Sequence, residues 1–319
     1  MGKSRILVVG ATGEMGKFVV EASVKLGHPT FVLVRPGSGS DPDKKALLAE
    51  FESLGAVSLH GDIGDHDSLV AALKQVDVVI STVGGAAVLD GQLKLIDAIE
   101  EVGHIKRFLP SEFGANIDVH SPNEKSILDL VFAPKRAIRK VLREKGIPHT
   151  LICCGGFARW VWAPLAQIDA LFGDGQPPRD KITILGDGEG LTVASSEIDI
   201  ATLTVLAADD PRTLNKQLVI RHKPNLLTFN SLVELWEKKI GHSLHKTFVP
   251  EAEVQKQLDG LNPNSIADFF HAIIWELVSG REIFPLNPSI DVDSDELYPD
   301  YKYVTVDEYF DKFVEKKRA

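Results

Sequence analysis

Arg5-Ile-Leu-Val-Val-Gly-Ala-Thr-Gly-Glu-Met-Gly16 stands near the start of the chain and decides its fold. Ile6 to Val9 is an unbroken apolar run, which is typical of a parallel strand covered on both faces. Gly10, Gly13 and Gly16 follow at three-residue spacing, and an apolar-periodic stretch then predicts a helix. A strand, a glycine turn and a helix in this order let bare backbone and a helix N-terminus approach a dinucleotide pyrophosphate. The stretch therefore predicts a dinucleotide site.

A second apolar strand, Phe31 to Val34, indicates which dinucleotide is bound. It ends in Arg35, at the place where a site that prefers NAD usually carries Asp or Glu for the ribose hydroxyl. An arginine there favours the 2′-phosphate of NADP. A glycine-rich structural turn beside a surface arginine is the simpler alternative, since glycine triplets also occur without a ligand. We expect NADPH to be the cofactor.

Composition places the chain among ordinary globular proteins. It has 319 residues, of which 44% are hydrophobic and 25% charged, and this length suits one large domain or two closely associated ones. The net charge of −10 argues against nucleic acid as a partner, because nucleic-acid binders concentrate positive charge. No apolar stretch approaches the roughly 20 residues that span a bilayer, so we expect no membrane partner.

The two cysteines also limit the possible chemistry. Cys153 and Cys154 are adjacent in an apolar run, and we expect them to be buried as small hydrophobic residues. Neither a CxxC pair nor a His/Cys metal pattern is present, so no metal is expected. The first predicted strand begins within five residues of Met1, with no sign of a leader segment. A cytoplasmic enzyme is the simplest interpretation.

Strands and helices alternate through the first half of the chain. Strands are expected at 56–60, 76–82, 106–110 and 149–154, and helices at 43–54, 68–74, 92–102 and 135–145. Repeated βα units of this length predict an α/β fold with a doubly wound, mostly parallel sheet of the Rossmann type.

The second half has weaker periodicity and is expected to be smaller and mainly helical. We predict a helix at 195–208, a short strand at 218–221 and an amphipathic helix at 229–240, followed by mainly helical chain. The predicted division is a dinucleotide-binding domain over 1–154, joined by segments from about 195–235, and a substrate-binding part over 155–194 and 240–319. This part would cover the carboxyl edge of the sheet, where open α/β folds bind ligands.

A bound nicotinamide would carry hydride, so the protein must position a substrate and move one proton. Many short-chain reductases use Tyr-x-x-x-Lys for this step. Tyr298 and Lys302 have that spacing, but Pro299 lies between them and disfavours the helix that would align both side chains. We therefore interpret this match as a coincidence.

Lys135 is the better candidate for the proton transfer. Helical spacing places Lys135, Ile138, Arg139 and Leu142 on one face. Burial of the lysine and the charge of Arg139 would both lower the pKa of Lys135 toward neutrality, where proton transfer is most efficient. Charged runs on helices usually face water, so the spacing alone favours a solvated helix end.

Longer motifs add a resemblance to a known family. The chain resembles, essentially end to end, the plant isoflavone reductase-like family of NmrA-like, NADPH-dependent reductases. This family includes phenylcoumaran benzylic ether, pinoresinol–lariciresinol, isoflavone and leucoanthocyanidin reductases. The resemblance rests on the segments 10–16, 27–35, 77–84, 106–114, 146–150, 184–188, 210–216, 236–241 and 297–303.

The resemblance implies roles for particular residues. It places the pyrophosphate on the glycine segment, the 2′-phosphate on two basic side chains, the proton transfer on one lysine and the substrate beside a histidine and aromatic residues. The glycine segment comprises Gly10, Ala11, Thr12, Gly13, Glu14, Met15 and Gly16. The two basic side chains are Arg35 and Lys44, the lysine is Lys135 and the histidine is His271. Arg139 is implied at the cofactor, and Phe157 is one of the aromatic residues expected to wall the substrate pocket or to pack in the core. From the sequence alone, Lys44 would be an exposed loop lysine and His271 a structural histidine.

The chain departs from the family pattern at several positions. Pro134 precedes Lys135, so it either starts the helix or changes the direction in which the Lys135 side chain points. Gly155 stands where most relatives carry Asn, and Arg159-Trp160 replaces a Gly-Tyr pair. Ala115 stands where leucoanthocyanidin reductases carry a histidine, and nearby His120 is a possible substitute.

Taken with the resemblance, these features predict an NADPH-dependent reductase of phenylpropanoid-derived aromatic substrates, of the benzylic ether or lignan type. Lys135 would move a proton at a phenol or ether oxygen, and hydride would reach the benzylic carbon of a quinone-methide-like intermediate. Leucoanthocyanidin reduction is the first alternative. A non-catalytic NmrA-like regulator that senses NADP is the second. We expect a small aromatic substrate, and a homodimer is left open as the assembly.

Overall fold

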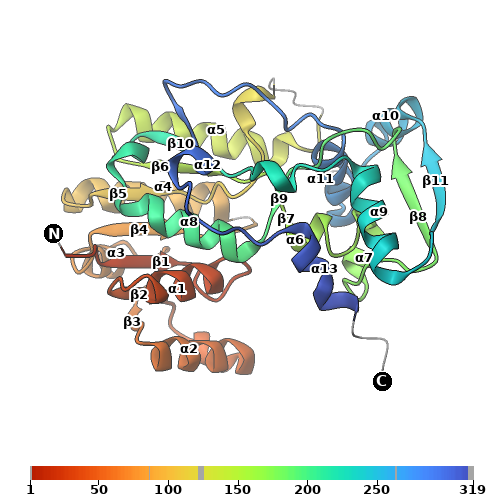
Figure 1. The fold of residues 1–319 in the computed structure, drawn as a ribbon. Coiled ribbons are helices and arrows are strands. Elements are labelled where there is room, and N and C mark those ends of the chain that lie inside the picture. Colours follow the sequence, from red (N-terminus) through yellow and green to blue (C-terminus); the bar gives the residue numbers. More distant parts are fainter. Residues whose placement is uncertain (1, 86, 121–125, 263, 315–319) are drawn as a thin grey trace.

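The computed structural model describes residues 2–85, 87–120, 126–262 and 264–314. The first part of the molecule is built on a five-stranded parallel sheet (Figure 1). Its strands are β1 (Ile6–Val9), β2 (Thr30–Val34), β3 (Val57–His60), β4 (Val78–Ser81) and β5 (Arg107–Leu109), in the order β3-β2-β1-β4-β5. The strand order reverses between β1 and β4, and a doubly wound sheet binds ligands at the carboxyl edge of such a point.

A second set of parallel strands continues this sheet. β6 (Thr150–Cys153), β10 (Lys216–Val219) and β12 (Asp291–Asp293) are ordered β12-β10-β6, and a bridge between Phe108 and His149 joins β6 to β5. The predicted parallel α/β fold is confirmed. β12 comes from the segment 240–319, so this part of the chain also contributes to the sheet.

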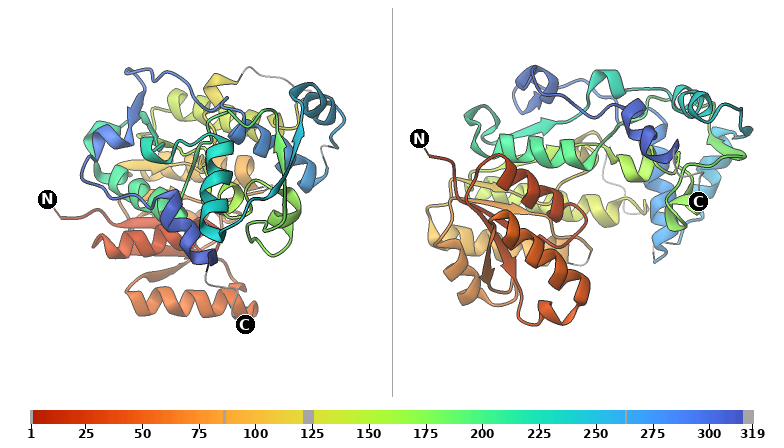
Figure 2. Two further views of the ribbon diagram at one scale, coloured as in Figure 1. Left: turned by 45° about the vertical axis from the view of Figure 1, so that its right-hand side comes forward. Right: turned by 60° about the horizontal axis from the view of Figure 1, so that its bottom comes forward.

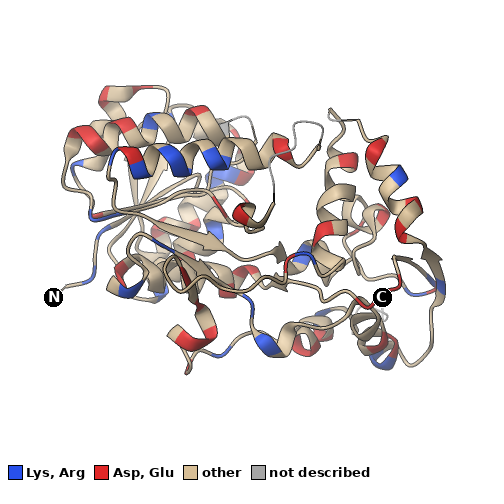
Figure 3. Cartoon of the chain, turned by 90° about the horizontal axis from the view of Figure 1, so that it is seen from above, with Lys and Arg blue, Asp and Glu red and all other residues tan. Residues whose placement is uncertain are grey.

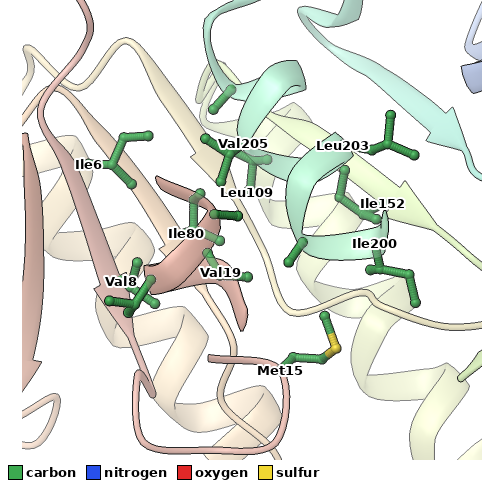
Figure 4. Packing of buried hydrophobic residues seen from close by; sticks show 14 of the residues in the cluster. Ile6, Val8, Met15, Val19, Ile80, Leu109, Ile152, Ile200, Leu203 and Val205 are labelled. Carbon is green, nitrogen blue, oxygen red and sulfur yellow. The ribbon is translucent and has the colours of Figure 1, made fainter. Parts of the chain in front are cut away.

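Alternate residues of β1 enter two separate cores. Ile6 and Val8 pack with Val19 of α1 (Gly16–Lys25) and Ile200 of α8 (Glu197–Asp209), as Figure 4 shows. The next core contains Leu7 and Val9 with side chains of α3 (His66–Leu73), α4 (Ala87–Val102) and α5 (Asp129–Glu144). Both faces of β1 are therefore covered, which explains its unbroken apolar sequence.

α2 (Pro42–Leu54) begins one residue before its predicted start, and α9 (Phe229–Ile240) has the predicted bounds. α5 does not, because it begins at Asp129 and includes Pro134 in its interior. The expectation that Pro134 starts this helix is wrong. Lys135 therefore lies in the body of α5 and not at its exposed end.

The second part lies beyond the carboxyl edge of the sheet (Figures 1 and 2). Its helices are α6 (Ala158–Val161), α7 (Ile168–Phe172), α9, α10 (Glu251–Asp259), α11 (Ile266–Val278) and α13 (Val306–Val314). Short strands accompany them: the parallel pair β8 (Lys181–Leu185) and β11 (His245–Val249), and the pair β7 (Gly156–Phe157) and β9 (Ala194–Ser195). The short helix α12 (Ser294–Leu297) follows β12 and belongs to the first part, where Leu297 packs in the same core as Ile6 and Val8.

The pair β8 and β11 was not expected, because the substrate-binding part, over 155–194 and 240–319, was predicted to be mainly helical. Only Ile182 and Ile184 of β8 are deeply buried, and β11 is largely exposed, so hydrophobicity gives a weak strand signal here. Acidic and basic residues are mixed along the helices of both parts (Figure 3). In the part of the chain that the structure describes, no helix has the length and apolar character to cross a membrane.

Candidate active site

The turn between β1 and α1 has almost no room for side chains. Gly10 has a φ of +85°, and a Cβ on Gly16 would lie 2.1 Å from the carbonyl oxygen of Gly10. The Gly13 amide donates to that same oxygen at 2.9 Å. Directly after β4, the Thr82 hydroxyl donates to the carbonyls of Val9 and Gly10, at 3.0 Å in each case. The result is a fixed cradle of bare backbone that fits a pyrophosphate.

A cavity of about 510 Å³ runs from this turn across the ends of β1 and β2. Arg35 and Lys44 both line it, as does Lys94 of α4. Arg35 and Lys44 are exposed, and Lys44 pairs with Asp41 at 3.3 Å. The structure thus brings together the two basic residues expected at a 2′-phosphate. Sequence reasoning missed Lys94, which no motif marked.

A second cavity, of about 400 Å³, adjoins the first, and the two share Gly13 and the segment 82–84. Lys135 lines this second cavity together with Glu14 and Met15 of the glycine turn. Further parts of its wall come from the segment 111–115 after β5 and from side chains of α5 and α11. The glycine turn and Lys135, far apart in the sequence, therefore belong to one continuous cleft.

Lys135 is buried, with 8% of its surface exposed, and its Nζ donates a short hydrogen bond to the carbonyl oxygen of Glu112. Phe113, which follows Glu112, has a φ of +29°, a conformation that is costly for a bulky residue. This φ helps to set the plane of the peptide group that carries the acceptor carbonyl. The amine is thus held at a fixed place in the cavity wall.

Arg139 lies one turn after Lys135 on the same face of α5 and fixes the Glu112 side chain. Its Nε and Nη2 donate to the two carboxylate oxygens of Glu112 at 2.9 and 2.8 Å. It also donates to Asp118 at 2.7 Å and to Gln217 at 3.1 Å. The face of α5 that carries Lys135 and Arg139 is buried, so the interpretation of this stretch as a solvated helix end is wrong. Arg139 is outside the lining of both cavities, so its expected contact with the cofactor stays a prediction.

The pKa of Lys135 is lowered from its ordinary value, mainly because burial disfavours the charged amine. The Glu112 carboxylate opposes this shift, and Arg139 adds to it. The expected direction and both expected causes are confirmed. Sequence reasoning assigned no role to Glu112, although it lies in the Ser-Glu-Phe-Gly segment that supports the family resemblance.

Aromatic side chains form much of the second cavity. Phe157 is 5% exposed and its ring centroid lies 4.4 Å from that of Trp160, and both residues line the cavity. Trp160 in turn meets Phe270 of α11 edge to face at 5.1 Å. Such walls suit an aromatic ligand and exclude water from the amine of Lys135.

His271 lies on a different side of α11 from the residues that line this cavity, which include Phe269 and Ile273. Its Nε2 is buried and has no hydrogen-bond partner within the described ranges. The sequence left its role open between a substrate contact and a structural histidine. A direct contact between His271 and the substrate stays a prediction.

Ala115 lines the cavity, but His120 does not take the place of a histidine there. His120 Nε2 is 2.9 Å from Glu282 Oε1, and its Nδ1 is 3.9 Å from Glu276 Oε2. These three side chains could offer ligand atoms to a metal, since the atoms lie within 4.8 Å of one another. Arg281 pairs with Glu276 at 3.1 Å, so the charges balance within the cluster.

Gly155 has a φ of +61°, which Asn also tolerates, but a Cβ here would lie 2.6 Å from Val193. The glycine therefore allows the close approach of Val193. Cys153 and Cys154 are both free and buried, as expected. Burial is the main cause of their raised pKa values, that of Cys154 to about 12.

A doubly wound parallel sheet with a tight glycine turn at its switch point defines a Rossmann-type dinucleotide-binding protein. The model of the NmrA-like family matches residues 2–310, and the chain belongs to this family.

Three relatives are similar over nearly their whole length. Isoflavone reductase homolog P3 of Arabidopsis thaliana is 49% identical, with 98% of each chain covered. Eugenol synthase 2 of Clarkia breweri is 48% identical, with 98% of this chain and 99% of the relative covered. Phenylcoumaran benzylic ether reductase TP7 of Nicotiana tabacum is 47% identical, with the same coverage.

Solved structures agree with these relatives. An isoflavone reductase superposes with a TM-score of 0.90 at 41% identity, covering 98% of this chain and 100% of the other. A structure described as AtPrR2 with NADP+ and (+)pinoresinol superposes with a TM-score of 0.88 at 36% identity, covering 98% of this chain and 99% of the other. A leucoanthocyanidin reductase–NADPH complex from Vitis vinifera superposes with a TM-score of 0.87 at 35% identity, covering 98% of this chain and 100% of the other.

Proposed function

We propose that the chain is an NADPH-dependent oxidoreductase that reduces phenylpropanoid-derived aromatic substrates of the benzylic ether or lignan type. The observation that carries this proposal is the buried amine of Lys135 in an aromatic cavity continuous with the glycine turn. The names of the relatives support it, since phenylcoumaran benzylic ether reductases and a structure with NADP+ and pinoresinol are among them.

When bound, NADPH supplies the hydride. The backbone of residues 10–16 would accommodate the pyrophosphate, and Arg35 and Lys44, which line the first cavity, would hold the 2′-phosphate. Both basic side chains are exposed, so they can reach a phosphate from solvent. This part of the site binds and orients, and it takes no part in proton transfer.

The proton step belongs to Lys135. Because burial lowers its pKa, the amine exchanges a proton with a phenol or ether oxygen more readily than an exposed lysine would. Glu112 fixes the amine through its carbonyl, while Arg139 fixes Glu112 through its carboxylate. Phe157 and Trp160 would pack against the substrate ring and keep water from the reacting atoms.

The two alternatives are supported less well. Leucoanthocyanidin reduction would lack the expected histidine, since Ala115 faces the cavity and His120 is paired with Glu282 outside it. A purely regulatory protein has no need for an amine with a lowered pKa in an aromatic pocket. The eugenol synthase among the relatives adds a monomeric phenylpropanoid product to those that should be assayed.

The test is turnover of a small panel: a phenylcoumaran, pinoresinol, a leucoanthocyanidin and a monomeric phenylpropanoid. NADPH oxidation is followed by absorbance and the products by mass spectrometry. We expect Lys135→Ala to lower kcat by about 10²- to 10⁴-fold with NADPH affinity retained. Lys140→Ala, which alters an exposed lysine of the same helix, should match the native protein.

Equal turnover by the native protein and Lys135→Ala would remove this lysine from the chemistry. Turnover of the leucoanthocyanidin alone would favour the first alternative. NADPH binding without turnover of any phenolic compound would favour the regulatory one.

We further propose that the protein works in the cytoplasm as a homodimer. Light scattering at several protein concentrations tests the assembly, and a fluorescent fusion in plant cells tests the location.

A further inference from the structure

An exposed ion pair joins the glycine turn to the second part of the molecule. Arg159 Nη1 of α6 lies 2.8 Å from Glu14 Oε1, and Glu14 belongs to the turn between β1 and α1. The family resemblance does not account for this pair, because it implies a glycine at the position of Arg159. The pair is therefore a property of this chain, and it lies beside the cradle described for the pyrophosphate.

Arg159 is held in place by its main chain and by its neighbour. Its backbone N–H donates to Glu197 Oε1 at 3.1 Å, and Glu197 is 6% exposed. The next residue, Trp160, is fixed between Phe157 and Phe270. The guanidinium is thus presented to the glycine turn from a well-anchored backbone.

The guanidinium also has unused hydrogen-bonding capacity. Its side chain is 52% exposed, and within the described ranges Glu14 is its side-chain partner through Nη1. A guanidinium carries five N–H donors in a planar fork, so Nε and Nη2 can bind a second anion while Nη1 keeps Glu14. An exposed ion pair contributes little to stability, so a small rotation of Arg159 has a low cost.

Glu14 requires such a partner if an anion binds here. A carboxylate in the glycine turn repels a pyrophosphate, whereas an arginine between the two attracts both. We propose that Arg159 is a phosphate ligand of this chain, which bridges Glu14 and the pyrophosphate of the bound dinucleotide. This inference rests on the proposed function, because it requires a dinucleotide on residues 10–16.

The test is a binding titration that needs no turnover. NADPH is titrated into the native protein, Arg159→Ala, Arg159→Lys, Glu14→Gln and the double variant Glu14→Gln/Arg159→Ala, with protein fluorescence as the readout. We expect Arg159→Ala to weaken NADPH binding by about tenfold, which is the lower end for a charge-assisted phosphate contact. Arg159→Lys should recover part of the loss.

The double variant separates phosphate binding from simple neutralisation of Glu14. If Arg159 binds phosphate, the double variant recovers only part of the loss, because removing Glu14 relieves its repulsion of the pyrophosphate but does not restore the arginine–phosphate contact. If Arg159 only neutralises Glu14, removing both charges restores the native affinity, and that result overturns the inference.

A smaller probe locates the effect. Adenosine 2′-monophosphate carries the 2′-phosphate but no pyrophosphate, so Arg159→Ala should bind it as the native protein does. An equal loss for this probe and for NADPH would overturn the inference. Arg212→Ala is the matched control, since it removes an exposed arginine paired with Asp210 at 2.6 Å. If the native protein does not bind NADPH, both the proposed function and this inference fail, whereas native binding with an unaffected Arg159→Ala refutes the inference alone.

Discussion

The two adjoining cavities place their positive charges in contrasting surroundings. In the cavity beside β2, Arg35 and Lys44 are exposed, and the nearest acidic partner of Lys44 is the half-exposed Asp41. In the cavity beside α5, Lys135 is 8% exposed and lies above the buried pair of Arg139 and Glu112. The basic side chains of the first cavity are therefore hydrated, whereas the amine of Lys135 in the second cavity is largely removed from water.

This difference separates binding from proton transfer. An exposed cation stays charged at neutral pH and attracts a phosphate, but salt screens it. A buried amine loses hydration, its pKa falls, and it becomes able to give up a proton. A positively charged side chain therefore binds phosphate when it is exposed and can transfer a proton when it is buried.

The largest expected effect comes from removing the support of the buried cavity. Arg139→Met leaves the Glu112 carboxylate buried without its partner, which should lower the free energy of unfolding by about 3–5 kcal/mol. Urea unfolding measures the loss. Arg143→Met, an exposed position on the same helix, should change stability by less than about 0.5 kcal/mol. Similar losses in the two variants would show that Glu112 does not depend on Arg139.

The exposed cations should affect affinity and leave stability nearly unchanged. Arg35→Ala and Lys44→Ala should each weaken NADPH binding by about 1.5–3 kcal/mol, the usual range for a hydrogen bond to a charged group. NADH affinity should stay the same, because NADH lacks the 2′-phosphate. Calorimetry with both coenzymes tests this, with Lys45→Ala as the control from the same helix. A matching loss of NADH affinity would contradict the assignment.

A smaller effect tests the cost of burying Lys135. Lys135→Met should raise the free energy of unfolding by about 1 kcal/mol at pH 7 while it lowers kcat as Lys135→Ala does. An unfolded lysine has a pKa near 10.4, and the folded value is lowered, so between the two values the unfolded chain binds more protons. The stability of the native chain therefore rises with pH in that window.

The advantage of Lys135→Met should accordingly be largest below the folded pKa and shrink as the pH approaches about 10. Urea unfolding at pH 7 and pH 9.5 tests this dependence. A variant that is less stable than the native protein at pH 7 would show that the hydrogen bond to Glu112 outweighs the burial of the amine.

Much of the fold and part of the site could be predicted from local patterns. The apolar run at 6–9, the three glycines and the stripe through Lys135 and Arg139 each lie within one element, where periodicity is informative. The lowered pKa of Lys135 was expected if that stripe is buried, whereas the charged run by itself favoured a solvated helix end. β8 and β11 carry few buried side chains and were missed.

The remaining features depend on contacts between segments far apart in the sequence. Glu112 was missed because its role arises from Arg139, which reaches it from another element. Arg159 appeared only as a departure from the family until the structure placed it beside Glu14. The effect of Pro134 was also unpredictable, since the start of α5 at Asp129 depends on tertiary packing and not on the local sequence.

The two buried thiols at the end of β6 make this protein convenient to label. A thiol with a pKa near 12 is almost wholly protonated at neutral pH, and only thiolates react with maleimides. A new cysteine on the surface, such as Phe172→Cys on α7, would then be the one reactive site on an otherwise native chain. A dye attached there, beside Phe270 of α11, would report ligand entry without any prior removal of cysteines.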